Sequence, residues 1–204
     1  MKKATDVFGE WATKGKDRGM ENSHSLPVSE MLDFLFTERK RNFSFLDLGC
    51  GNGWVVRKVA KNPLCSKAVG IDGAKQMISN ANSLNDGSLE YILADINVFN
   101  SKEKYDIIHS MEVLYYLDNP SEIVCKISDS WLNKGGRLVV GVDHYYENTD
   151  CHSWQEKVGT RMHMLKEAEW IQIFERAGLV DVESWHANKH RGWAGTLVIT
   201  GKKQ

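Results

Sequence analysis

The sequence is short of three features that would each point to a class of protein: a long apolar run, a repeat, and a surplus of charge of one sign. A membrane-spanning helix needs about 20 consecutive apolar residues, and no run approaches that length. The formal net charge of −1 and the pI near 6.7 disfavour a strongly basic face for nucleic acid. We therefore expect neither a membrane nor a nucleic acid as a partner.

Cysteine pairs are missing as well, because the four cysteines lie far apart and form no C-x-x-C motif. We also expect no secretory leader, since Met1-Lys2-Lys3 leads into polar residues rather than an apolar core. The simplest expectation is a cytoplasmic protein with free thiols at Cys50, Cys65, Cys125 and Cys151.

What the chain does contain is enough apolar sequence for one folded unit. Its 204 residues and 23.2 kDa fit a single compact α/β domain, with 42% hydrophobic and 26% charged residues. Short apolar runs alternate with helical patterns, which predicts a doubly wound, mostly parallel sheet with helices on both faces. The first five strands are expected at residues 43–48, 68–72, 89–96, 104–112 and 137–142.

The most informative stretch spans residues 45–54 and reads FLDLGCGNGW. An apolar run gives way to three glycines at alternate positions, and residues 54–60 have the apolar spacing of a helix. This pattern predicts a buried strand, a tight turn and the start of a helix. Glycine tolerates positive φ and lets a ligand approach the bare backbone, so we expect a ligand at this turn.

The spacing of the glycines separates two kinds of cofactor site. Dinucleotide-binding folds use G-x-G-x-x-G, whereas Gly49, Gly51 and Gly53 follow G-x-G-x-G, which disfavours a nicotinamide oxidoreductase. The segment from Asp47 to Gly53 resembles the first motif of class I S-adenosylmethionine-dependent methyltransferases, of the small-molecule, type 11/12-like kind. The resemblance implies that the loop, with Cys50, passes beneath the methionine part of the cofactor.

Two further predicted strands end in an acid, Asp72 and Asp95. A carboxylate at such a strand end can accept both hydrogen bonds of a ribose diol, or it can cap the next helix, and the two roles are compatible. The resemblance assigns Asp72 to the ribose, and Asp95 with the N–H of Ile96 to the adenine. The cofactor-binding set that it implies is Asp47, Gly49, Cys50, Gly51, Asp72, Gly73, Asp95, Ile96 and Met111.

The resemblance covers roughly residues 30–200. It implies a seven-stranded sheet closed by a C-terminal antiparallel hairpin, with final strands at 180–185 and 196–200, so that residues 27–204 form a single methyltransferase domain. A first helix is expected at 27–39, with Ser25 as its N-cap and Pro27 in its first turn.

Residues 1–26 are expected to form an N-terminal lid segment, and a mobile arm is the alternative. Phe8, Trp11 and Met20 favour the lid, because a solvated tail has little need of them together. Such aromatic segments close over the cofactor in many small-molecule methyltransferases, which the resemblance extends to this chain.

Methyl transfer from a sulfonium is an in-line displacement, so positioning supplies much of the catalysis. A base is needed only if the acceptor must lose a proton, and the candidates are His144, His109 and Glu112. A histidine with a pKa of about 6.5 suits a neutral base. His109 could instead be a structural histidine at a strand end, and Glu112 could orient a cationic or amine acceptor.

Aromatic residues gather near the predicted strand tips and in the N-terminal segment. Trp11, Tyr115, Tyr116 and Tyr145 are expected to bind the substrate, either as a box around an apolar or cationic acceptor or as ordinary packing of a lid. The spacing of His144, Cys151 and His152 matches no zinc pattern, so no metal is expected.

The predicted function is methyl transfer from S-adenosylmethionine to a small-molecule acceptor, with S-adenosylhomocysteine as the second product. Residues 109–112 read HSME, where a DNA or RNA amino-methyltransferase would show an Asn-Pro-Pro-Tyr type motif. Two alternatives stay open. The same fold could methylate a protein or an RNA, or the chain could be a non-catalytic module that binds S-adenosylmethionine or S-adenosylhomocysteine.

Overall fold

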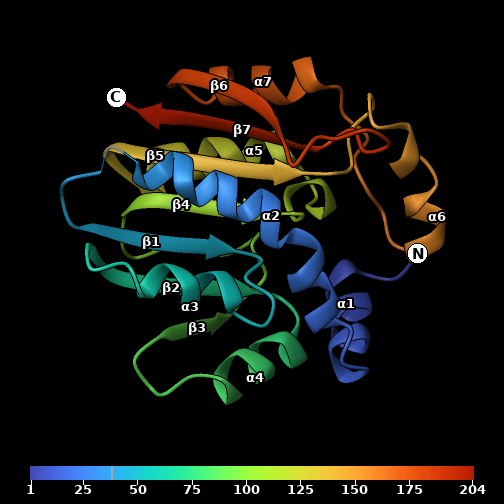
Figure 1. Cartoon of the computed structure of the whole chain (residues 1–204), viewed down its shortest axis with the longest axis horizontal. Coiled ribbons are helices and arrows are strands. Elements are labelled where there is room, and N and C mark those ends of the chain that lie inside the picture. The colour runs from blue at the N-terminus through green and yellow to red at the C-terminus, as the bar shows by residue number, and fades with distance from the viewer. Residues whose placement is uncertain (38) are drawn as a thin grey trace.

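A seven-stranded sheet forms the centre of the part of the chain that the computed structural model describes, residues 1–37 and 39–204. Its strand order is β3-β2-β1-β4-β5-β7-β6, with β7 antiparallel to both of its neighbours and the other pairings parallel (Figure 1). The predicted doubly wound sheet with a C-terminal antiparallel hairpin is confirmed. The strands are β1 (Phe43–Leu48), β2 (Cys65–Asp72), β3 (Glu90–Leu93), β4 (Tyr105–Met111), β5 (Leu132–Val142), β6 (Leu179–Ala187) and β7 (Thr196–Lys203).

Helices cover both faces of this sheet, and short helical turns connect several strands. In Figure 1, α2 and α3 lie in front of the sheet, while α5 and α7 lie behind it. None of the helices in the described residues is long and apolar enough to span a membrane. The helical segments are α1 (Ala4–Thr13), α2 (Asp17–Phe36), α3 (Trp54–Ala60), α4 (Lys75–Ser83), η1 (Leu114–Tyr116), α5 (Pro120–Lys126), η2 (Ile127–Trp131), η3 (Thr149–Cys151), α6 (Trp154–Val158) and α7 (Glu167–Arg176).

Two large apolar cores lie on opposite faces of the sheet, and β1 contributes to both. Successive side chains of a strand point to opposite faces, so Phe43 and Phe45 pack with α2 and α3, whereas Leu46 and Leu48 pack with α5 and α7. Because both faces are covered, the central strands read as nearly continuous apolar runs rather than as alternating ones. This burial fixes the carboxyl ends of β1, β2 and β4 at one edge of the sheet.

Helix α2 differs from the prediction, which placed its start at Ser25 and Pro27. The helix begins at Asp17 and Pro27 lies inside it, so the predicted boundary between lid and domain at residue 26 falls within a continuous helix. A tertiary contact outweighs the local signal, because the buried carboxylate of Asp17 accepts hydrogen bonds from Asn52 and Asn80 at 3.3 and 3.2 Å. Of the predicted residues 27–39, Glu38 lies outside the described residues.

Helix α1 and helix α6 both lie at the edge toward which the parallel strands point (Figure 1). A small cluster of Ala12, Ala74 and Met77 packs α1 on α4, and the N–H of Lys2 donates to the carbonyl of Gly159 at 3.1 Å just after α6. Chain segments from both halves of the sequence therefore enclose this edge.

Candidate active site

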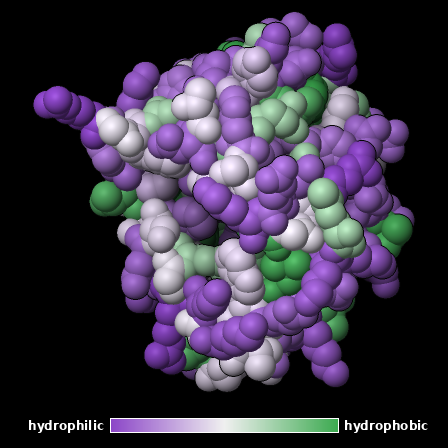
Figure 2. Space-filling view, turned by 90° about the vertical axis from the view of Figure 1, so that its right-hand side faces the viewer, coloured by the Kyte–Doolittle hydropathy of each residue, from purple (hydrophilic) through white to green (hydrophobic). Residues whose placement is uncertain are grey.

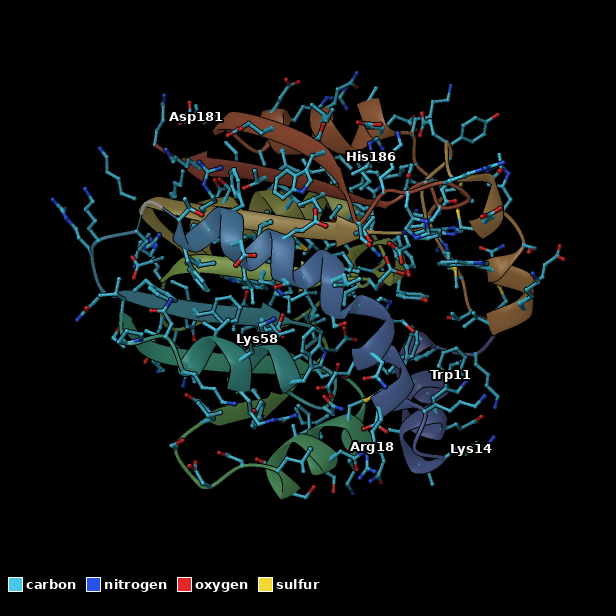
Figure 3. The ribbon with its side chains drawn as sticks, viewed as in Figure 1. Trp11, Lys14, Arg18, Lys58, Asp181 and His186 are labelled. Atoms are coloured by element: carbon cyan, nitrogen blue, oxygen red, sulfur yellow. The ribbon has the colours of Figure 1, made fainter. Side chains whose placement is uncertain are left out.

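The carboxyl ends of the parallel strands open into a cavity of about 1490 Å³. Its walls are the loop after β1, the tips of β2 and β4, the segment after β3, and residues of α1, α2 and α6. Figure 2 shows this end of the molecule, which is hollowed near its middle, with hydrophilic and apolar residues both at the rim. Figure 3 places Trp11 and Arg18 at this end and Asp181 at the opposite end of the sheet.

The glycine loop has the backbone geometry that its sequence predicts. Gly49, Gly51 and Gly53 all have positive φ, at 72°, 53° and 78°. A Cβ on Gly49 would lie 2.1 Å from Val113 Cγ2, and one on Gly53 would lie 2.4 Å from Tyr91 Cε1, so both positions exclude a side chain. A Cβ on Gly51 would meet nothing closer than 3.9 Å, and this glycine borders the cavity. The loop therefore leaves bare backbone facing a space for a ligand.

Asp72, at the end of β2, holds this loop in place. Its Oδ2 accepts the N–H of Gly51 at 2.9 Å and its Oδ1 accepts the N–H of Ala74 at 2.7 Å, at the start of the turn into α4. Each oxygen keeps a lone pair for a ligand hydroxyl, so the turn contact and the predicted ribose contact are compatible. Burial raises the pKa of Asp72 to about 6.

The third acid, Asp95, follows β3 and lies on the exposed side of the cavity. Its Oδ1 accepts the backbone and side-chain N–H groups of Asn97 at 3.0 and 2.9 Å, while Ile96 is buried beside it. All nine residues of the predicted cofactor set line the one cavity. Their contact with a cofactor stays a prediction, and the residues present fit one because bare loop backbone and two carboxylates meet there.

His109 is paired with Asp47 beneath the glycine loop. Its Nδ1 lies 2.7 Å from Asp47 Oδ1, and both side chains are almost fully buried. We assign Nδ1 as the donor to Asp47, because an ionised carboxylate can only accept. Within the described residues, Nε2 has no hydrogen-bond partner, and His109 lines the cavity. His109 is thus a positioned strand-end histidine with one ring nitrogen left without a partner.

Glu112 turns the chain at the end of β4, where it adopts a φ of 60°, in the left-handed region. Its carboxylate accepts the hydroxyl of Tyr115 at 2.7 Å and also the backbone N–H of Asp143. Burial and the nearby charge of Asp143 raise the pKa of Glu112 well above its usual value. Asp143 accepts the hydroxyl of Thr196 at 2.5 Å, and burial raises its pKa to about 6.

The sequence reasoning missed His24. This residue lies on α2 and lines the cavity, and its ring lies with the carboxylates of Glu112 and Asp143, all three ligand atoms being within 4.8 Å of one another. Burial lowers the pKa of His24 to about 4, which keeps its ring neutral. A signal did exist, because His24 precedes Val28 and Met31 by four and seven residues, on one helical face.

Two predicted site residues at the tip of β5 do not reach the cavity, whose wall within residues 1–37 and 39–204 leaves out His144 and Tyr145. His144 is 1% exposed and packs between Tyr115 and Trp154, with ring centroids 5.2 and 6.3 Å away. The hydroxyl of Tyr145 donates to the carbonyl of Gly195 at 3.0 Å. At this strand tip the chain directs Asp143, not His144, toward Glu112.

The remaining predicted aromatic residues do line the cavity. Tyr116 packs against Tyr115 and against Phe8, with ring centroids 4.3 and 5.1 Å apart, and Phe8 packs against Trp11. The contact between Phe8 and Tyr116 joins the N-terminal helix α1 to the turn after β4. These rings form an aromatic wall next to Glu112.

The comparisons with known proteins agree with this geometry. A family model described as a methyltransferase domain matches residues 22–184. Malonyl-[acyl-carrier protein] O-methyltransferase of Halalkalibacterium halodurans is 33% identical over 116 residues, which cover 52% of this chain and 42% of that protein. The chain spans about half the length of the curated relatives it matches.

Solved structures match over more of the chain. One lies in a complex between the Haloferax volcanii Trm112 methyltransferase activator and a methyltransferase, with a TM-score of 0.84, 26% identity and 96% of each chain covered. The N-methyltransferase NodS of Bradyrhizobium japonicum, solved with S-adenosyl-L-homocysteine, has a TM-score of 0.67 at 22% identity over 86% and 84% of the two chains, a likeness of fold. The chain therefore belongs to the methyltransferase-domain family, within the class I S-adenosylmethionine-dependent methyltransferases.

Proposed function

We propose that this protein transfers a methyl group from S-adenosylmethionine to a small-molecule acceptor. One observation carries the proposal: a single cavity joins the glycine loop and its acidic neighbours to an aromatic compartment that α1, α2 and α6 enclose. A compartment of this kind suits a small acceptor better than a folded macromolecule.

The residues divide the work of binding. S-adenosylmethionine supplies a methyl group on a positively charged sulfur. Asp72 would accept the hydrogen bonds of its ribose, and the segment of Asp95 and Ile96 would contact its adenine. The backbone at Gly49 and Gly51 would lie beneath the methionine part, where an added Cβ on Gly51 would project toward open space.

Support for a small acceptor also comes from a relative of Papaver somniferum named as (S)-coclaurine N-methyltransferase, although the relatives differ in the acceptor atom. The Halalkalibacterium relative is named as an O-methyltransferase and NodS as an N-methyltransferase. The choice of atom must therefore come from the residues around the acceptor compartment of this chain.

Isothermal titration with S-adenosylmethionine and S-adenosylhomocysteine tests the cofactor half of the proposal. We expect the wild type to bind both, and Asp72→Ala to bind each at least about tenfold more weakly because two hydroxyl contacts are lost. Asp129→Ala is the matched control, because Asp129 is exposed and does not belong to the cavity wall. Unchanged affinity in Asp72→Ala would contradict the assignment of the ribose site.

Transfer of a labelled methyl group tests the catalytic half. Small-molecule pools and macromolecular fractions of an extract are incubated separately with the protein and labelled S-adenosylmethionine. Label in the small-molecule pool supports the proposal, whereas label in protein or RNA supports methylation of a macromolecule. Tight cofactor binding with no label in any fraction would identify a non-catalytic binding module.

A further inference from the structure

One cluster in the cavity has no part in holding the predicted cofactor groups. It consists of His24 from α2, Glu112 at the exit of β4 and Asp143 at the tip of β5, with the three ligand atoms within 4.8 Å of one another. His24 and Glu112 line the cavity, and Asp143 lies behind them with 6% of its surface exposed. The fold brings these residues together from three separate elements, of which the first and the last, at His24 and Asp143, are more than a hundred residues apart.

The cluster is rich in acceptors and poor in positive charge. Among residues 1–37 and 39–204, no lysine, arginine or histidine forms an ion pair with Glu112 or Asp143 within 4.0 Å. Two carboxylates that share a buried site cannot both ionise without a counter-charge, so either one holds a proton or a cation binds. The pKa values of Glu112 and Asp143 are both raised, as expected for two carboxylates that share a buried site without a counter-charge.

A second, independent observation points to a ligand with hydrogens to donate. The Nε2 of His109 is fully buried and has no hydrogen-bond partner in the part of the chain that the structure describes, and His109 lines the same cavity. With Nδ1 assigned as the donor to Asp47, Nε2 of the neutral ring is an acceptor. A buried polar atom without a partner is unfavourable, so a ligand donor is the natural complement.

The spacing of the cluster allows one ammonium nitrogen to reach all three ligand atoms. Three acceptors that each lie at a normal N–H···O distance of about 2.9 Å from an ammonium nitrogen are themselves about 4.7 Å apart. The three ligand atoms here lie within 4.8 Å of one another. Next to them, Tyr115 donates its hydroxyl to Glu112 and packs against Tyr116, so aromatic side chains border the cluster.

We propose that the methyl acceptor is an amine, which the cluster of His24, Glu112 and Asp143 binds in its ammonium form. This inference rests on the proposed function and specifies its acceptor. An alcohol or phenol would meet the same acceptors with a single hydrogen to donate, and a carboxylate would be repelled. The cluster therefore selects for amine nitrogen over the oxygen acids.

The same cluster also supplies a base for the proton that the ammonium nitrogen must lose before it can be methylated. A protonated amine has no lone pair, so one proton must pass from the ammonium nitrogen to a base, and Glu112 is the carboxylate of the cluster that lines the cavity. The freed lone pair forms the new N–C bond while the C–S bond of the methyl donor breaks, and the electron pair of that bond stays on sulfur. The positive charge moves from sulfur to nitrogen, where Asp143 and the neutral ring of His24 remain as hydrogen-bond acceptors.

The first experiment measures binding without turnover, by titrating matched ligands into the protein saturated with S-adenosylhomocysteine. The probes are arylalkyl and alkyl amines together with the alcohols and carboxylates of the same carbon skeleton, such as 2-phenylethylamine, 2-phenylethanol and 3-phenylpropionate. We expect amines to bind about tenfold or more tightly than their alcohols. Glu112→Gln should remove this preference, while the control Glu103→Gln, an exposed surface acid, should keep it.

Three outcomes would overturn the inference: alcohols that bind as tightly as amines, an amine preference that survives Glu112→Gln, or no binding by any amine of the panel. A fourth is a metal site, shown by binding of MgCl₂ or MnCl₂ alone and its loss in Asp143→Asn. Failure of the proposed function is distinguishable, because it appears earlier as a protein that binds neither S-adenosylmethionine nor S-adenosylhomocysteine. Methyl transfer to the preferred amines, measured with labelled donor, completes the support.

Discussion

The two halves of the cavity are built in different ways. The half predicted to hold the cofactor comes from consecutive strand ends, with the glycine loop after β1, Asp72 after β2 and Asp95 after β3. The half that we propose to bind the acceptor, called the acceptor half, comes from separate regions, with His24 on a helix before the sheet and Glu112 and Asp143 after β4 and β5. A cofactor site built from one repeated local pattern can be shared by every member of a family. An acceptor site assembled from distant parts of the chain can change its residues without disturbing that cofactor site.

The largest expected effect comes from the glycine loop. Gly49→Ala should lower the free energy of unfolding by about 2–5 kcal/mol, because Gly49 has a positive φ and its Cβ would overlap Val113. Chemical denaturation measures the loss. Gly51→Ala is the matched control, since it shares the positive φ but a Cβ there meets no atom closer than 3.9 Å. Equal losses in the two variants would show that backbone strain, not the overlap, decides the effect.

The next effect concerns the ionisation of Asp72 in the cofactor half. Its pKa of about 6 means that the carboxylate is ionised at pH 7.5 and increasingly neutral below pH 6. We expect the affinity for S-adenosylmethionine to be constant above pH 7 and to fall by up to about tenfold per pH unit below 6. Asp72→Asn should bind about tenfold more weakly at pH 7.5 and lose this pH dependence. Titration calorimetry between pH 5 and 8 measures the affinity of both proteins. If the affinity of Asp72→Asn depends on pH as that of the wild type does, the assignment of Asp72 to the ribose is contradicted.

The contrast between the halves also explains what the sequence could predict. The pattern of Gly49, Gly51 and Gly53 together with Asp72 and Asp95 is local, so strand and turn signals were enough to find it. His24 was missed because the polar residues before Pro27 masked a helix that a distant contact of Asp17 with Asn52 and Asn80 extends backward. No local signal reports such a contact.

The tip of β5 shows a second limit of prediction from the sequence. The tip was recognised, but His144 and Tyr145 were chosen over Asp143. Once a strand ends, the alternation of side chains no longer predicts which residue turns toward a neighbouring site; none of residues 143–145 lines the cavity, but Asp143 contacts Glu112, which does. Here the backbone N–H of Asp143 bonds Glu112 and its carboxylate bonds Thr196, so this residue is turned toward the acceptor half. Both contacts span more than thirty residues of sequence.

A smaller effect is expected in the acceptor half, where the ionisation of Glu112 changes the stability of the fold. The pKa of Glu112 is raised in the folded state, so the native protein binds more protons than the unfolded chain above the ordinary pKa of the group. The contribution of Glu112 to stability is therefore complete below that ordinary pKa and is lost as the pH rises through the folded value. Glu112→Gln should be more stable than the wild type by about 1 kcal/mol at pH 8, and the gain should vanish near pH 4.

Thermal or denaturant unfolding of Glu112→Gln and wild type across pH 4–8 measures this difference. The control Glu103→Gln, at an exposed pair with Lys67, should change stability little at any pH. If the wild type is more stable than Glu112→Gln at pH 8, the negative charge of Glu112 is already balanced by other groups of the protein. The acceptor half would then lack the unsatisfied charge that calls for a cationic ligand.

The smallest effect is expected at Asp17, which connects the two halves of the cavity. Asp17 ties the start of α2, which carries His24, to Asn52 in the glycine loop and to Asn80 on α4. Asp17→Ala should lower the free energy of unfolding by about 1 kcal/mol, because the buried amide of Asn52 and the half-buried amide of Asn80 lose their acceptor. Asp33→Ala on the exposed side of the same helix should have no such cost. If the halves are coupled through α2, Asp17→Ala will also weaken amine binding to the protein saturated with S-adenosylhomocysteine, by freeing His24 from its place. An intact amine affinity in this variant would mean that Glu112 and Asp143 hold the acceptor without help from the helix.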